Sequence, residues 1–125
     1  MFEQNEVIAL DIKNKAEYYN NDIRLKRILT RISNYGDLAI NLSDFNYILK
    51  LRKIDKHYSI TKLKELLHSN NIGYSWLIKN LKIPRATLSK ILNSERNVKL
   101  ITLNKMFSII SNNTELKISK QDLLD

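Results

Sequence analysis

Residues 73–92 read GYSWLIKNLKIPRATLSKIL, and two short helical patterns lie back to back within them. Leu77 and Leu81 are one turn apart, so they share a face of the first helix. The second helix has apolar residues at three- and four-residue spacing, at Leu88, Ile91 and Leu92. Only about two or three residues separate the patterns, and Pro84 stops the first helix from running on. So short a turn makes the two helices cross at a steep angle, which is the helix-turn-helix geometry.

The side of the second helix that is not apolar carries small, polar or cationic residues, namely Arg85, Ala86, Ser89 and Lys90. A short helix that is buried on one side and presents such residues on the other suits the major groove of DNA.

From about Lys62 to Ile110 the chain resembles the phage-repressor-type (Cro/Xre-like) helix-turn-helix family. The resemblance lies in a leading helix, a recognition segment, a loop and a closing helix, which read LKELL at 63–67, IPRATLSKI at 83–91, NSERN at 93–97 and LITLNKMFSII at 100–110. Two positions depart from the family pattern. Ile78 stands where a small residue is usual, so it needs a compensating gap between the paired helices. Lys82 stands where a turn glycine is common, so the turn must accept a non-glycine residue at positive φ.

The resemblance implies a mainly α-helical fold, with a DNA-binding domain of repressor type and a recognition helix at about 84–92. It implies base contacts from Arg85, Ala86, Ser89 and Lys90, at the positions from which related repressors contact bases. It also implies contacts to the DNA backbone from the start of the first paired helix and from residues that flank the groove, namely Tyr74, Ser75, Lys79, Thr87, Arg96, Asn97 and Lys99. Arg85 would bond a guanine bidentately and Ala86 would meet a thymine methyl group.

Composition and charge favour the same class of partner. The 125-residue chain has a net charge of +8, and residues 59–110 hold nine Lys or Arg against Glu65 and Glu95, which is a net charge of +7 in that part. Such a basic stretch favours salt-sensitive binding to nucleic acid. With no cysteine, only His57 and His68, no glycine-rich phosphate loop and no paired acidic motif, we expect no metal site, no cofactor and no enzyme activity. The absence of a secretory signal or a long apolar run predicts a soluble, cytoplasmic protein.

We expect a helical N-terminal region at 1–58, which serves in dimerisation or partner binding or as a second DNA-binding unit, and a DNA-binding domain at 59–125. Residues 6–12 are apolar and fit either a short strand or a helical turn. A helix is predicted from about Ala16, with Arg24, Lys26, Arg27 and Arg31 on its polar side. That side is either a solvated face or a second basic surface along the DNA backbone. Gly36 is predicted to form a left-handed cap at the end of this helix.

Further predictions concern capping and the C-terminal part. Ser43 and Thr61 are candidate N-caps. Residues 38–49 faintly echo 77–88, which would make a second helix pair. The apolar stripe of the closing helix predicts core positions, at Leu100, Leu103, Met106, Phe107 and Ile110. Residues 114–119 alternate in hydrophobicity and suggest a strand, and residues 120–125 are expected to be mobile.

Trp76 is expected to point away from the face of Leu77 and Leu81. We therefore predict that the N-terminal half or a second subunit packs on it. The preferred function is a transcriptional repressor or regulator that binds double-stranded DNA as a homodimer on paired half-sites. A monomer with two helix-turn-helix units is the alternative assembly. The alternative functions are an antitoxin-like protein with a protein partner on residues 1–58, and an architectural protein of a mobile element, which acts in plasmid transfer, replication or excision.

Overall fold

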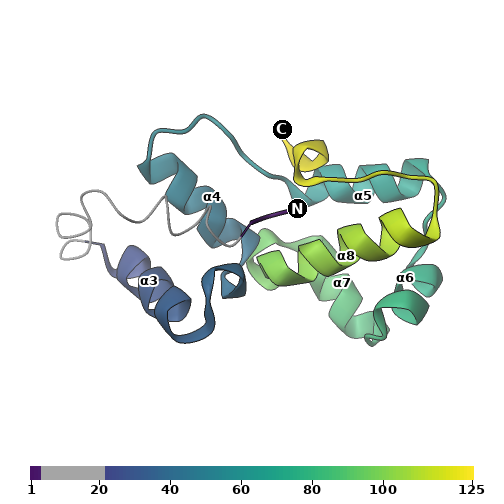
Figure 1. Ribbon diagram of the computed structural model, residues 1–125, viewed down its shortest axis with the longest axis horizontal. Helices are drawn as coiled ribbons and strands as arrows, with labels where there is room; N and C mark the ends of the chain where they lie inside the picture. The colour runs from purple at the N-terminus through teal and green to yellow at the C-terminus, as the bar shows by residue number, and fades with distance from the viewer. Residues whose placement is uncertain (4–21) are drawn as a thin grey trace.

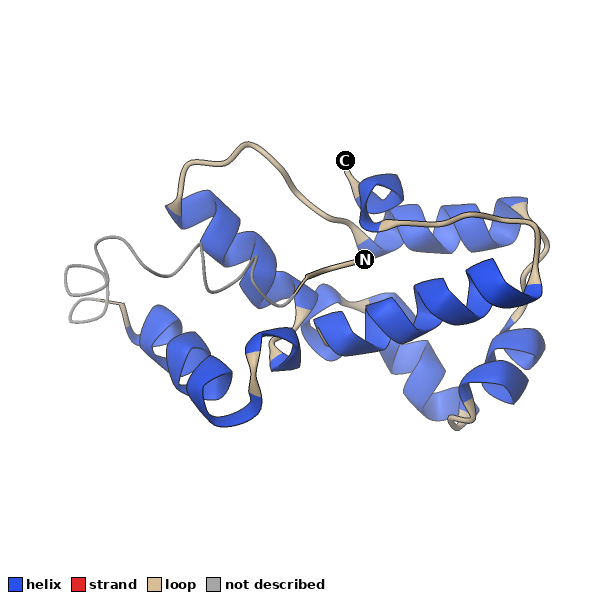
Figure 2. Ribbon diagram, in the orientation of Figure 1, coloured by secondary structure: helices blue, strands red, loops and turns tan. Residues whose placement is uncertain are grey.

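The structure, a computed structural model, describes residues 1–3 and 22–125 and is mainly α-helical. The helices in chain order are α3 (Ile23–Tyr35), η1 (Asp37–Ala39), α4 (Leu42–Leu51), α5 (Ile60–Ser69), α6 (Tyr74–Leu81), α7 (Arg85–Asn93), η2 (Glu95–Asn97), α8 (Leu100–Asn113) and η3 (Lys120–Leu123), where η marks a 3-10 helix. Within the described ranges there are only helices and loops, with two isolated β-bridges and no sheet (Figure 2). None of these helices is both long and apolar enough to cross a bilayer.

Figure 1 shows α3 and α4 on one side of the molecule and α5 to α8 on the other. One hydrophobic cluster runs through both sides. Phe2 lies at its centre, with its ring centroid 5.3 Å from that of Phe45 and 6.3 Å from that of Phe107. Its backbone amide donates to the side chain of Asn104 at 2.8 Å, and Asn104 donates back to the Phe2 carbonyl. The predicted boundary at 58/59 therefore crosses a shared core.

Two predicted N-caps are wrong. The helix expected to begin after Ser43 begins at Leu42, because the Asn41 side chain caps it by accepting from the Asp44 amide at 2.7 Å. The next helix begins at Ile60, capped by Ser59 rather than Thr61. Asparagine and serine rank together as N-caps, so local preference alone does not choose between neighbouring candidates.

Part of the helix predicted from about Ala16 is described as α3, whereas residues 16–21 lie outside the described residues. α3 starts at Ile23, because the Asp22 side chain accepts from the Leu25 amide and caps it there. It ends at Tyr35, and Gly36 has the predicted positive φ of 92°, but its ψ of 167° differs from a left-handed helical cap. The predicted element at 6–12 lies outside the described residues. The echo at residues 38–49 does not form a second pair of α-helices, because η1 is only three residues long.

The closing helix α8 buries the predicted stripe, but the predictions for residues 114–125 are wrong. Residues 114–119 form a loop rather than a strand, although Ile118 is buried. Residues 120–125 are held by backbone hydrogen bonds: the amide of Ser59 donates to the Leu123 carbonyl at 2.7 Å, and that of Asp125 donates to the His57 carbonyl at 3.0 Å. Leu123 is fully buried, so burial of one apolar side chain helps to hold the end of the chain in place.

Candidate nucleic-acid interface

The predicted helix pair is present as α6 and α7, joined by residues 82–84. Leu77 of α6 and Leu88 of α7 are fully buried. α6 ends at Leu81 because Lys82 adopts the left-handed conformation, with φ 58° and ψ 44°, and its amide donates to the Ile78 carbonyl at 2.9 Å. Pro84 has an extended backbone immediately before α7. The non-glycine residue expected at positive φ in the turn is thus confirmed at Lys82.

Two neighbouring helices hold this pair in position. α5 packs against α7 and α8 packs against α6. Ile78, which stands where a small residue was expected, is half-buried at the edge of the core. The pair accommodates this larger side chain because part of it remains at the surface.

The outward side of α7 carries the four residues predicted to contact bases. Arg85, Ala86 and Lys90 are exposed and Ser89 is half-buried. Arg85 reaches back to the start of α6, where its guanidinium donates to the Ser75 hydroxyl at 3.3 Å. The exposed Thr87 belongs to the same first turn of α7 as Arg85.

Arg85, a predicted base contact, also lies beside Tyr74, a predicted contact to the DNA backbone at the start of α6. Its Cζ atom lies 5.8 Å from the centre of the Tyr74 ring. Lys79 is exposed one turn after Ser75 in α6, so the two share a side of that helix. The first turns of α6 and α7 therefore bring predicted backbone and base contacts together.

The loop after α7 carries the remaining predicted contacts, Arg96, Asn97 and Lys99, all of which are exposed. The Asn97 side chain donates to the Lys90 carbonyl at 3.1 Å, which ties the loop to the last turns of α7. On the other side, the Leu42 amide donates to the Val98 carbonyl at 2.9 Å. The loop is thus bonded both to α7 and to the start of α4, which fixes the backbone that carries Arg96 and Lys99.

Trp76 differs from the expectation of a large exposed aromatic ring. It is half-buried and packs against the hydrophobic core of its own chain. The position next to Leu77 on α6 still faces the core edge, so the ring finds apolar neighbours without a second subunit. That the N-terminal half or a second subunit packs on Trp76 stays a prediction.

The polar side of the N-terminal helix was predicted to be either a solvated face or a second basic surface along the DNA backbone, and the structure shows where its arginines lie. Arg24, Arg27 and Arg31 line a cavity of about 630 Å³ together with Arg96 and Lys99 of the loop after α7. Their spacing of three and four residues indicates that they share a helix face. That this face looks toward the loop after α7 depends on how α3 packs, and no local pattern carries that information.

Arg24 is fixed on this face by several contacts. Its guanidinium pairs with Asp44 at 3.2 Å and lies 4.3 Å from the centre of the Tyr47 ring. Tyr47 also donates its hydroxyl to Asp22. Burial opposes ionisation of Asp22, but this bond, the amides of Leu25 and Arg24, and the Arg24 charge outweigh it and lower the pKa of Asp22.

No group of three or more His, Cys, Asp or Glu side chains that could hold a metal ion occurs in the described part of the chain. Apart from Ala86, the residues predicted to contact DNA carry cationic, amide or hydroxyl groups, which are suited to phosphates and base edges. Comparison of the chain with protein-family models, curated proteins and solved structures finds no match.

Proposed function

We propose that this chain is a sequence-specific DNA-binding protein of helix-turn-helix type, and that it regulates transcription, most simply as a cytoplasmic repressor. In this proposal α7 enters the major groove and Arg85, Ala86, Ser89 and Lys90 face base edges. The single observation that carries the proposal is the outward side of α7. It is small, polar and cationic, while Leu88, Ile91 and Leu92 are buried on the opposite side.

Contacts to the DNA backbone would come from both ends of this surface. The first backbone amides of α6 lack partners within the helix, and Tyr74 and Ser75 stand there. Arg96, Asn97 and Lys99 stand at the other end, on the anchored loop. Because phosphate contacts position a protein and base contacts specify the site, the two groups should respond differently to substitution.

Assembly as a two-fold dimer on paired half-sites is part of the proposal, since a single short helix reads only a few base pairs. Catalysis is not. Sedimentation of the complex with a selected duplex would give two chains per site if the dimer is correct, and one chain per site would exclude it.

The test begins with selection of bound sites from a pool of randomised duplexes. The affinities of wild type, Arg85→Ala and Lys99→Ala are then measured for the selected duplex and a scrambled one over a salt series. Wild type should prefer the selected duplex. Arg85→Ala should lose about 1–3 kcal/mol of that preference, whereas Lys99→Ala should weaken both duplexes alike and lower the salt slope by about 1.

Lys105→Ala is the matched control, because it removes an exposed cation from α8 outside the proposed interface. It should leave the preference unchanged. Failure of the selection to enrich any sequence, or equal loss of preference in Arg85→Ala and Lys105→Ala, would contradict base reading by α7.

A further inference from the structure

The cavity between α3 and the loop after α7, here called the basic cavity, is lined by five cationic side chains. They are Arg24, Arg27, Arg31, Arg96 and Lys99. The first three come from α3 and the other two from the segment that follows α7, so residues far apart in the sequence converge here.

Within the described residues, carboxylates do not balance the positive charges of the basic cavity. Among the described residues that line it, Asp44 is the one carboxylate, and it already pairs with Arg24 at 3.2 Å. Within residues 1–3 and 22–125 the structure records no ion pair for Arg27, Arg31, Arg96 or Lys99. Like charges one turn apart on a helix repel, as Arg27 and Arg31 do. An anion in the cavity would relieve this repulsion.

Both walls of the basic cavity are held in place. Arg24 joins α3 to α4 through Asp44 and through a bond from its guanidinium to the Ser43 hydroxyl at 3.0 Å. The opposite wall is anchored where the Leu100 amide donates to the Ile40 carbonyl at 3.0 Å. The cations are therefore presented from a prearranged frame, which lowers the ordering cost of binding.

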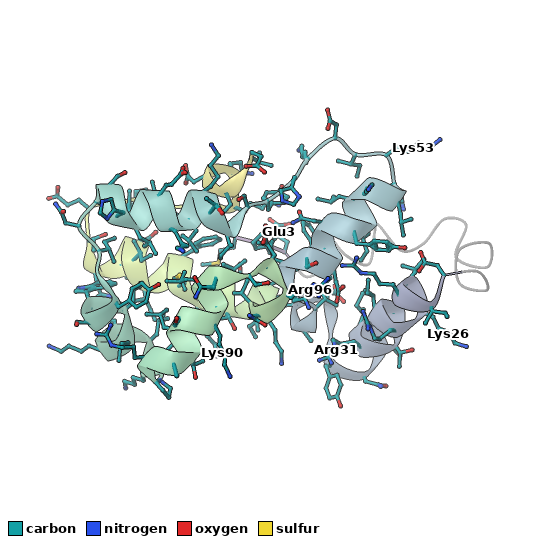
Figure 3. All side chains as sticks on the ribbon, turned by 180° about the vertical axis from the view of Figure 1, so that it is seen from behind. Glu3, Lys26, Arg31, Lys53, Lys90 and Arg96 are labelled. Atoms are coloured by element: carbon teal, nitrogen blue, oxygen red, sulfur yellow. The ribbon has the colours of Figure 1, made fainter. Side chains whose placement is uncertain are left out.

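The basic cavity is continuous with α7. Asn97, which lines it, donates to the Lys90 carbonyl at 3.1 Å. In Figure 3, Arg96 lies between Lys90 and Arg31 from left to right, whereas Lys53 lies near the upper edge of the view. An elongated anion that lies along α7 therefore meets the cavity next.

The geometry points to a second phosphate-binding surface, an inference that rests on the DNA-binding function proposed above. The basic cavity receives the sugar-phosphate backbone of the same duplex, beyond the base pairs that α7 reads. Arg27 and Arg31 are the central contacts, because guanidinium groups bond phosphate oxygens bidentately. The N-terminal region thus lengthens the contact with DNA without reading sequence.

The test uses the double variant Arg27→Ala/Arg31→Ala in the full chain. Arg24 is left intact because it joins α3 to α4. The matched control is Lys105→Ala/Lys117→Ala, which removes two exposed cations outside the cavity. Affinities for the selected and scrambled duplexes are measured over a salt series, with hydroxyl-radical footprints of each complex, and circular dichroism verifies that both variants keep their helices.

Each phosphate contact contributes about 0.9 to the slope of log affinity against log salt, so the double variant should lower the slope by about 1.8 for each bound chain. Between 50 and 200 mM salt the affinity should therefore fall less for the double variant than for wild type, by a factor of about 12 for each bound chain. The preference of the double variant for the selected duplex should be unchanged, and the backbone protection that extends beyond each half-site should disappear. The control should keep the wild-type slope and footprint.

Equal slopes and footprints for the double variant and the control would overturn the second surface while leaving the function of α7 intact. If wild type itself fails to prefer any duplex, the proposed function fails instead. Stabilisation of wild type, but not of the double variant, by pyrophosphate, together with an unchanged DNA slope, would assign the cavity to a small phosphorylated ligand and overturn the DNA assignment.

Discussion

Replacement of Lys82 by glycine should stabilise the protein, because Lys82 holds the left-handed conformation in the turn between α6 and α7. That conformation costs a residue with a β-carbon about 1–2 kcal/mol, and glycine avoids the cost. Glycine also gives the unfolded chain more freedom, which takes back about 0.4–1 kcal/mol. The net gain in the free energy of unfolding should be about 0.5–1 kcal/mol, or roughly 0.25–0.5 M in the urea midpoint.

Lys82→Ala is the control, since it removes the same charged side chain but keeps the β-carbon. Urea unfolding followed by far-ultraviolet circular dichroism, with Trp76 fluorescence as a second probe, measures both variants. The alanine variant should stay within about 0.5 kcal/mol of wild type. A glycine variant that is no more stable than the alanine variant would refute the left-handed turn, and with it the derived geometry of the helix pair.

Three further predictions concern the core and its carboxylates. Burial raises the pKa of Asp37, and its Oδ2 atom accepts no hydrogen bond in the described part of the chain, so its ionisation costs stability as the pH rises above the ordinary value. Asp37→Asn should therefore add about 1 kcal/mol at pH 7 and little at pH 3, as measured by urea unfolding. The pKa of Asp22 is lowered in part by the hydrogen bond from Tyr47, so the stability that ionised Asp22 contributes is present above its ordinary pKa and is lost as the pH falls through the lowered value. Tyr47→Phe removes this bond and should cost about 1 kcal/mol at pH 7 but much less at pH 2 in the same assay. Phe2→Ala should cost about 3–5 kcal/mol, and thermal melts should show one transition, because the cluster joins both sides of the molecule; two separate transitions in wild type would contradict the shared core.

Local patterns were sufficient to predict the central part of the fold. The apolar spacing located α6 and α7, and the closing helix buries the predicted stripe, including Leu103 and Phe107. Lys82 and Gly36 have the positive φ values expected at helix ends. These features depend on residues within a few positions of one another, so a single sequence carries them.

The remaining features depend on contacts between distant segments. Asn41 rather than Ser43 caps α4, and the first residue of this helix, Leu42, donates its backbone amide to Val98, more than fifty residues away. Residues 120–125 are held against the rest of the chain because Leu123 is buried in the core. Likewise, helical spacing puts Arg27 and Arg31 on one face, but only the packed structure places that face opposite Arg96.

The most direct test of the central claim is to locate α7 on bound DNA. The chain has no cysteine, so Asn93→Cys at the exposed end of α7 gives a single site for a DNA-cleaving iron chelate, and Lys117→Cys gives the control. With α7 in the major groove, the reagent on position 93 should cut the selected duplex within about one helical turn of the site, while that on position 117 should cut weakly and diffusely. Equally diffuse cleavage from both positions would contradict the placement of α7 in the groove.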